Sequence, residues 1–374
     1  MLRAAVHLMG GMVATRAGRR YRRARRLRSG KRGVVAVIGT LLALLVFFAL
    51  FGIFLTQYVP LWMTDNEAQF TNSAATSFAQ FKGGVDTQYA LGVPQLLGTP
   101  FTLSSGGVPL IAQPTESVLN FLPNSCPGGF YVRGMTGAST TNFGQPVIPG
   151  YCVFENQTMS TGPGSSPRLY EQAASGILQM ALPNRYYPSQ LFYFEDDAVV
   201  QVQSGTHNIM AVAPPFNVTR LAGNTTVTSS FLQLYGNTST VIAQGSEEIY
   251  SQLRFTQEIT SNGNQRLNSI GQTIFPFLNY SFEVGTEYPC AWASFLQSQM
   301  NVSGLPFVTH PSATQQGYNY TYLASTTQAA TIPYTGACYS PSGATTVLEV
   351  NLHAINYANL YYAGVQVTVG IGSV

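Results

Sequence analysis

An uncharged run of 22 residues constrains this chain more than any other feature of its sequence. It covers residues 34–55 and reads VVAVIGTLLALLVFFALFGIFL. As an α-helix it would span about 33 Å, which matches the hydrocarbon core of a bilayer. No second run of comparable length follows in the 374 residues. The sequence therefore predicts one membrane-spanning helix.

The charges are distributed very unevenly around this run. Residues 1–33 hold 11 of the 18 Lys and Arg and no acid, whereas the rest of the chain holds all 15 acids. By the positive-inside rule, the N-terminus stays in the cytoplasm and the part after the helix lies outside the cell membrane. The outer part carries a net charge of −8 and gathers no basic patch, which argues against nucleic-acid binding.

A cleaved secretory signal peptide is the first alternative to a retained helix. The apolar region of such a peptide is usually about 7–15 residues and ends at a small-x-small site. Here the run is longer, and Tyr58 and Trp62 follow it in the manner of an aromatic interface belt. These features favour a retained segment.

The residues around the start of the run carry a more specific signal. Lys31-Arg32-Gly33 followed by VVAVIGT resembles the N-terminal segment of archaeal type IV pilins, over about 25 residues. The resemblance implies that a prepilin peptidase cuts between Gly33 and Val34. It also implies that the mature helix packs against the helices of like subunits in a filament. A plain membrane anchor with an Arg-rich tail is the alternative.

Two positions depart from the pattern of that family. Ile38 stands where many pilins have a Glu that pairs with a neighbouring amino terminus, and Ala36 replaces a common Pro. The missing Glu favours a minor or adhesive subunit over a bulk one. Farther along, residues 194–200 and 210–216 resemble a segment of larger archaeal envelope proteins that share the pilin-like N-terminus.

The pattern divides the chain into four parts. We expect a basic cytoplasmic leader at 1–33, a transmembrane helix at 34–59, a helical stalk at 60–91 and a β-rich extracellular domain at 92–374. In the stalk, Phe70, Ala74, Phe78 and Phe81 share one helical face and need a partner, most simply the sheet that follows. Pro60 should kink this helix rather than end it, and the pair of glycines at 83–84 should stop or loosen it.

Short apolar runs separated by Gly, Pro, Asn, Ser and Thr fill the outer domain. They predict a mainly β fold, an antiparallel β-sandwich-like head behind a long N-terminal helix. Strands are expected at 129–133, 190–202, 209–213, 225–234, 238–243, 248–259, 318–323, 345–352 and 365–371. The best helical candidate in this domain is 169–180.

All four cysteines lie in the expected outer domain, which favours two disulfides. Neighbours in sequence would pair, Cys126 with Cys152 and Cys290 with Cys338. No C-x-x-C is present, which argues against zinc. Asn-x-Ser/Thr acceptor sites for N-glycosylation also lie there, at Asn156, Asn217, Asn224, Asn237, Asn279, Asn301 and Asn319.

Residues with recognisable catalytic chemistry are scarce. The sequence contains no G-x-S-x-G, H-E-x-x-H or P-loop, so we expect neither an enzyme nor a cofactor. Glu195, Asp196 and Asp197 form the only dense acidic cluster, interpreted mainly as a hydrated strand edge or turn. On a single strand Glu195 and Asp197 would share a face and could bind a calcium ion. Aromatic-rich segments could contact surface glycans or other cells, namely Tyr186-Tyr187, Tyr318, Tyr320, Tyr322 and Tyr361-Tyr362.

Overall fold

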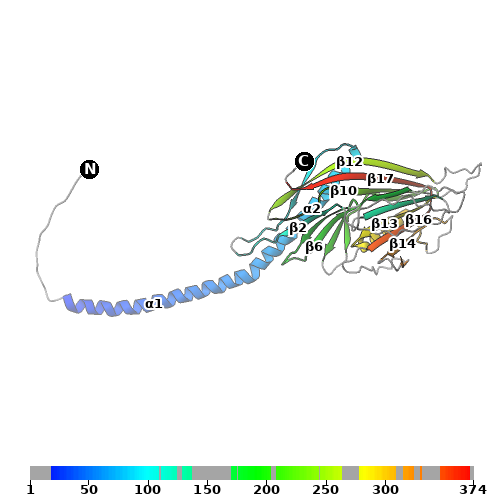
Figure 1. Ribbon diagram of the computed structural model, residues 1–374. Coiled ribbons are helices and arrows are strands. Elements are labelled where there is room, and N and C mark those ends of the chain that lie inside the picture. The colour runs from blue at the N-terminus through cyan, green and yellow to red at the C-terminus, as the bar shows by residue number, and fades with distance from the viewer. Residues whose placement is uncertain are drawn as a thin grey trace, which may run out of the picture. The chain divides into compact units, whose positions relative to one another are not determined.

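The computed structural model describes residues 18–108, 111–123, 129–136, 170–174, 176–203, 208–243, 245–262, 278–308, 315–323, 329–330 and 346–370 (Figure 1). In the first helix, side chains are described from Val35 onward. The chain divides into two compact units, Met1–Leu61 and Trp62–Val374. From Gly18 onward the first unit is helical, and the second holds the remaining part of the helix together with all of the described strands.

The helical segments follow one another without a break in the chain. Helix α1 (Gly18–Ile53) leads through a π-helical turn, η1 (Phe54–Tyr58), into α2 (Val59–Leu91). Proline lacks the N–H of a helical hydrogen bond, and its ring crowds the preceding turn. The wider turn lies directly before Pro60, with the Val59 N–H bonded to the carbonyl of Phe54. The helix therefore continues through Pro60, as the sequence predicts.

In the second unit, one face of α2 is buried. The predicted stripe of Phe70, Ala74, Phe78 and Phe81 lies in the core. The Phe78 ring meets Phe101 edge-on, with ring centroids 5.1 Å apart. A fully buried Phe stabilises a fold by about 1.5–3 kcal/mol. The prediction that this stripe packs on β structure is confirmed.

The pair of glycines at 83–84 does not stop the helix, so the predicted stop at this point is wrong. Helix α2 runs on to Leu91 because its last turns are held by tertiary contacts. Val85 is buried in the same core as the Phe stripe. The Gln88 side chain accepts the Leu253 N–H at 2.7 Å and donates to Ser251. Packing therefore outweighs the low helix propensity of glycine.

The described strands form three sheets. The first, in the order β1-β12-β17-β10-β9, contains β1 (Leu97–Thr102), β9 (Phe216–Leu221), β10 (Asn224–Tyr235), β12 (Ser246–Asn262) and β17 (Tyr357–Val369). The second, β11-β2-β5-β6-β7-β8, contains β2 (Ser117–Leu122), β5 (Ile177–Leu182), β6 (Gln190–Glu195), β7 (Ala198–Gln203), β8 (Ile209–Val212) and β11 (Ser239–Ala243).

The third sheet has the order β15-β14-β16-β13-β3-β4. It contains β3 (Gly129–Thr136), β4 (Tyr170–Ala174), β13 (Leu278–Thr286), β14 (Gly317–Leu323), β15 (Ala329–Ala330) and β16 (Thr346–Ile355). Among the described strands every ladder is antiparallel except that of β10 with β17. The coarse prediction, a long apolar N-terminal helix followed by a mostly β region of antiparallel sheets, is confirmed.

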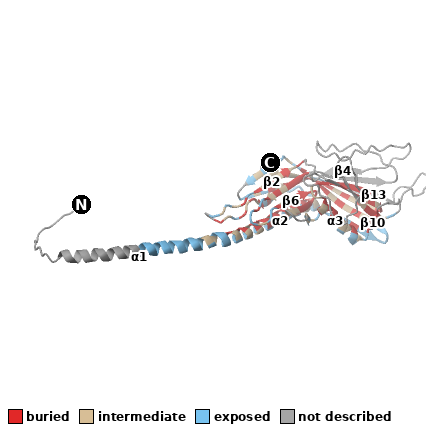
Figure 2. Ribbon diagram, turned by 90° about the horizontal axis from the view of Figure 1, so that it is seen from below, coloured by how far each residue is buried: buried red, intermediate tan, exposed pale blue. Residues whose placement is uncertain are grey.

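Two large cores lie along the long strands of the first sheet. One joins the buried face of α2 to the first and second sheets and includes Phe121, Phe194 and Val365. The other joins the first and third sheets to helix α3 (Pro289–Ser303) and includes Phe231 and Trp292. Strands β10 and β17 contribute to both cores. Figure 2 shows buried residues along β10 in red. The long strands thereby connect the two ends of this unit.

Three local predictions need correction. The strand expected at 190–202 is a hairpin, because β6 ends at Glu195 and β7 begins at Ala198. The helix expected at 169–180 is replaced by β4 and β5 over its described residues. Helix α3 was not predicted, although Pro289 at its first turn and Gly304 in the left-handed conformation after its end are typical boundary signals.

Candidate functional site

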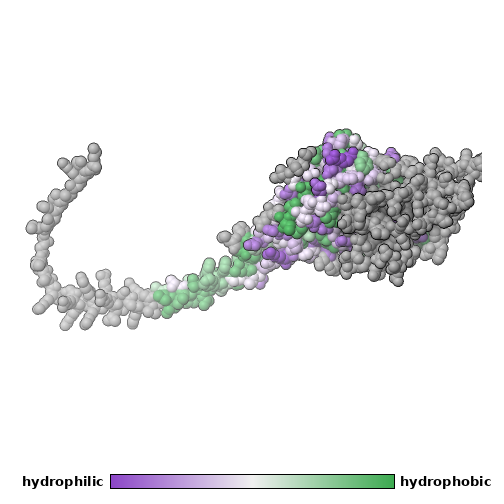
Figure 3. All heavy atoms as spheres, in the orientation of Figure 1, coloured by the Kyte–Doolittle hydropathy of each residue, from purple (hydrophilic) through white to green (hydrophobic). Residues whose placement is uncertain are grey.

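The first candidate is the apolar surface of the first unit. Its side chains from Val35 to Leu55 are almost all exposed, including Leu45 at 65% and Phe47 at 59% (Figures 2 and 3). Among the described residues this is the one helix long and apolar enough to cross a membrane. Its surface is apolar on all sides, which suits either lipid or neighbouring helices.

The predicted processing site lies within this helix. Gly33 and Val34 fall inside the span of α1, directly before Val35, the first residue whose side chain is described. Ile38 is 54% exposed and contributes one more apolar side chain where many pilins have a carboxylate. Cleavage between Gly33 and Val34 stays a prediction.

The second candidate is the turn that joins β6 to β7. Asp196 and Asp197 form a two-residue hairpin loop with φ values of 45° and 58°, between the paired residues Glu195 and Ala198. Positive φ at both positions is the pattern of a type I′ turn, which Asp tolerates better than most residues. The acidic cluster is thus a turn, but it is buried rather than hydrated. Asp196 is 1% exposed.

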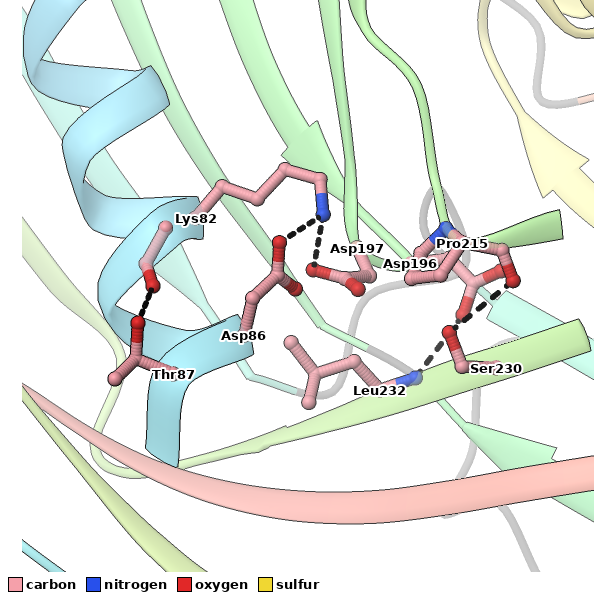
Figure 4. Close-up of polar contacts among 9 residues, drawn as sticks. Lys82, Asp86, Thr87, Asp196, Asp197, Pro215, Ser230 and Leu232 are labelled. Carbon is pink, nitrogen blue, oxygen red and sulfur yellow. Dashed lines mark hydrogen bonds and ion pairs between the residues drawn. The ribbon is translucent and has the colours of Figure 1, made fainter. Parts of the chain in front are cut away.

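Helix α2 supplies the only described cation in contact with this turn (Figure 4). The Lys82 Nζ lies 2.7 Å from Asp86 Oδ2 and 3.3 Å from Asp197 Oδ1. The side chains of Lys82 and Asp197 are 6% and 8% exposed, whereas that of Asp86 is 43% exposed. Burial strongly raises the pKa of Asp197; the Lys82 charge opposes this rise, and the Asp86 charge adds to it.

Glu195 points to a different set of partners. Its Oε1 accepts the Thr286 hydroxyl and the Trp292 indole N–H, both at 2.7 Å, and its Oε2 has no hydrogen-bond donor. Burial raises the pKa of Glu195 to about 7 despite these two bonds, and the nearby charge of Glu287 adds to the rise. The carboxyl group is therefore half protonated near neutral pH.

Asp196 is held by one backbone group. Its Oδ1 accepts the Leu232 N–H at 3.2 Å, and its Oδ2 has no donor. Burial raises the pKa of Asp196 well above its ordinary value; the bond from Leu232 opposes the rise, and the charges of Asp197 and Glu195 increase it. Three consecutive carboxyl groups thus have raised pKa values.

The calcium interpretation of Glu195 and Asp197 assumed one strand face, and that assumption is wrong. The two residues flank a turn and contact different partners, Trp292 and Thr286 for Glu195 and Lys82 for Asp197. Within the described residues no group of three or more His, Cys, Asp or Glu could hold a metal ion.

A further buried carboxylate, Glu67 on α2, was not singled out from the sequence. Its Oε2 accepts the N–H groups of Tyr186 and Tyr187 at 2.7 Å. Its Oε1 accepts the Arg185 N–H at 3.0 Å and the Thr115 hydroxyl at 2.8 Å. Burial alone would raise the pKa of Glu67, but the four hydrogen bonds outweigh it and lower the pKa.

A signal for these residues was present in the sequence. Glu67 precedes Phe70 by three positions and Lys82 follows Phe78 by four, so both charges lie on the apolar stripe of the helix. A charged residue on such a stripe must find a buried partner, because an isolated buried charge is very unfavourable. The buried partners, Asp197 for Lys82 and the N–H groups of residues 185–187 for Glu67, are far away in sequence, and only the fold identifies them.

The cysteines lie mostly outside the described residues. Cys290 is the second residue of α3 and is disulfide-bonded. Cys126, Cys152 and Cys338 fall outside the described ranges, so the pairing stays a prediction.

The glycosylation acceptors divide by exposure. Four of them are exposed, namely Asn217, Asn224, Asn237 and Asn301. Asn319 is half-buried on β14, the side chain of Asn279 is not described, and Asn156 lies outside the described ranges. Any glycan would most easily be attached at the four exposed positions.

Comparison of the chain with protein-family models, with curated proteins and with solved structures gives no match in any of the three. The functional argument therefore depends on the chain's own residues.

Proposed function

We propose that this protein is a pilin-like cell-surface subunit, minor or adhesive, of an archaeal type IV pilus-like filament. The observation that carries the proposal is the exposed apolar surface from Val35 to Leu55, directly after the Arg-rich leader and the Lys31-Arg32-Gly33 motif. Such a surface needs a bilayer before assembly and fits the helices of like subunits afterwards.

The proposal assigns each part of the chain a location relative to the cell membrane. The leader is cytoplasmic until a prepilin peptidase removes it after Gly33, and the β-rich unit lies on the outer side of the cell membrane. There the disulfides Cys126–Cys152 and Cys290–Cys338 would form, and N-linked glycans would be accepted. The absence of charged residues between Val34 and Leu55 supports both lipid insertion and helix packing.

Ile38 supports a second candidate function. Without a Glu at this position the helix lacks a partner for a neighbouring amino terminus. The alternative is a single-pass anchored binding or adhesion protein that does not polymerise.

The test is the mass and N-terminal peptide of the protein isolated from its native envelope. A chain that begins at Val34 supports prepilin processing, and filaments in electron micrographs then support assembly. A chain that begins at Met1 or Leu2 and stays monomeric in detergent contradicts the filament proposal and favours the anchor.

A pair of variants sharpens this test. Gly33→Val should block the cut and leave the leader attached. Gly39→Ala lies in the same helix, where an added Cβ meets no atom within 4 Å, and it should be processed like the native chain.

A further inference from the structure

Lys82 is chemically unusual in its surroundings. It is the only Lys or Arg in residues 34–132, and its side chain is 6% exposed. Phe81 directly precedes Lys82 in the sequence, and Phe194 lies two residues before the β6–β7 turn. Both rings belong to the core around α2. Their rings meet edge-on with centroids 5.1 Å apart. A primary amine is therefore held at the margin of an apolar core.

Two carboxyl groups meet this amine in different environments. Asp197 is buried on the two-residue turn, with its Oδ1 3.3 Å from the Lys82 Nζ. Asp86 is one helical turn after Lys82, is 43% exposed, and accepts a hydrogen bond from Nζ at 2.7 Å. Figure 4 shows the amine between the two carboxyl groups. The site thus contains a nucleophile, a buried electrophile and a solvent-connected proton acceptor.

We infer that Lys82 and Asp197 form an intramolecular amide bond between Nζ and Cγ. The inference goes beyond the proposed function and does not depend on it, because all three residues belong to the second unit.

The reaction is a condensation that needs no oxidant and no cofactor. A proton moves from the Lys82 ammonium to the Asp86 carboxylate along their hydrogen bond, which leaves a neutral amine. The Nζ lone pair attacks the Cγ of protonated Asp197, and a C–N bond forms. The Cγ–OH bond then breaks as Asp86 returns the proton to the leaving hydroxyl, and one water is released. The nitrogen gives up its second proton to the Asp86 carboxylate, which passes it to solvent, and a neutral amide N–H remains.

Three features favour this reaction over a permanent ion pair. Burial favours the protonated form of Asp197, which is a far better acyl donor than a carboxylate. The helix and the turn also hold the reacting groups in contact, which replaces a bimolecular encounter by an intramolecular one. The neutral amide also avoids most of the free-energy cost of keeping a pair of charged groups away from water.

The bond would connect two elements that are far apart in sequence. It would attach α2 directly to the β6–β7 hairpin, so that a force along the helix reaches the second sheet through covalent bonds. The hydrophobic contacts of the Phe stripe would then not carry that force alone.

The test is the intact mass of the full chain, purified in detergent from a host without N-glycosylation and reduced before measurement. We expect a mass lower by one water than the sequence requires. The same sample, digested with trypsin, should resist cleavage after Lys82 and yield residues 33–133 joined to residues 186–220. The native sequence alone decides this test, whatever the variants do.

Two variants check the assignment. Lys82→Arg keeps the cation but removes the primary amine, and it should restore the full mass. Asp86→Asn keeps the size of the side chain but removes the proton acceptor, and the bond should form about a hundredfold more slowly.

Two outcomes overturn the inference. One is the full, unmodified mass together with free peptides 33–82 and 186–220. The other is a lost water that fragmentation assigns to different residues, such as a succinimide at another Asp or Asn.

Discussion

Glu67 and Glu195 are both completely buried, yet their protonation equilibria shift in opposite directions. Four donors surround the Glu67 carboxylate, three of them backbone N–H groups of consecutive residues. Two donors reach Glu195, both on the same oxygen. The pKa of Glu67 is accordingly lowered, and that of Glu195 rises to about 7.

The comparison shows that burial alone does not determine the charge state of a carboxyl group. The charge state also depends on how deep the group lies, which is deeper for Glu195 than for Glu67, and on whether enough N–H and O–H groups replace the lost water. At Glu67 the anion is solvated by the protein and connects helix α2 to residues 185–187. At Glu195 solvation is incomplete, and the neutral acid is favoured up to neutral pH.

The largest expected effect comes from removing the Glu67 charge. Glu67→Gln replaces one acceptor oxygen by an NH₂ group that faces N–H donors, so we expect a loss of about 3–5 kcal/mol in the free energy of unfolding. Urea unfolding of the full chain in detergent, followed by circular dichroism, measures this. Asp65→Asn, on an exposed position of the same helix, should change stability by less than about 0.5 kcal/mol. Equal losses of stability in the two variants would contradict the conclusion that the hydrogen bonds to the buried Glu67 carboxylate stabilise the fold.

A smaller effect should appear in the pH dependence of stability. The folded pKa of Glu195, about 7, exceeds the ordinary 4.5, so the folded state binds this proton more tightly than the unfolded state. Its contribution is complete below pH 4.5 and is lost as the pH rises through 7, by about 3 kcal/mol in total. Asp196 and Asp197 act in the same direction, whereas Glu67 loses its contribution as the pH falls below 4.5.

Glu195→Gln should reduce the loss of stability between pH 4.5 and 7, because Gln does not titrate in this range. The variant should still fold, since Gln offers an oxygen to Trp292 and Thr286. Trp292 fluorescence in a Trp62→Phe background reports on this site directly, because the two Trp are the only ones in the sequence. An unchanged pH profile in the Gln variant would show that Glu195 is not the titrating group.

The smallest expected effect is a gain in stability at Asp196. Asp196→Asn keeps an oxygen for the Leu232 N–H, suits the φ of 45° and removes a carboxyl group whose charged form is disfavoured by burial. We expect about 1 kcal/mol of added stability at pH 7, measured by thermal or urea unfolding. Asp196→Ala lacks both the acceptor and the preference for positive φ, so it should be less stable than the Asn variant.

The sequence allowed much of the architecture to be predicted. Periodicity located the apolar stripe of α2, because a helix face buried on a sheet leaves a strong local pattern. Most expected strands also overlap the ones observed, such as 225–234 with β10 and 318–323 with β14. These are features that neighbouring residues determine.

The residues of the buried polar sites were not predictable in the same way. Asp196-Asp197 is a weaker turn signal than Asn-Gly, so the hairpin was interpreted as one continuous strand. The burial of Asp197 depends on Lys82, and the burial of Glu67 depends on residues 185–187. In both cases the partner lies far away in the chain. No local pattern specifies such pairs. Long-range packing also explains why α2 continues through the glycines at 83–84.

The position of β17 also determines when the second unit can fold. This strand comes from the last described segment of the chain, yet it lies inside the first sheet between β12 and β10. Strands β10 and β12 therefore cannot complete their ladders until residues 357–369 have emerged, and the parallel pairing with β10 needs a long loop closure. During synthesis the apolar edges of both cores therefore stay open until β17 has been made and can pair.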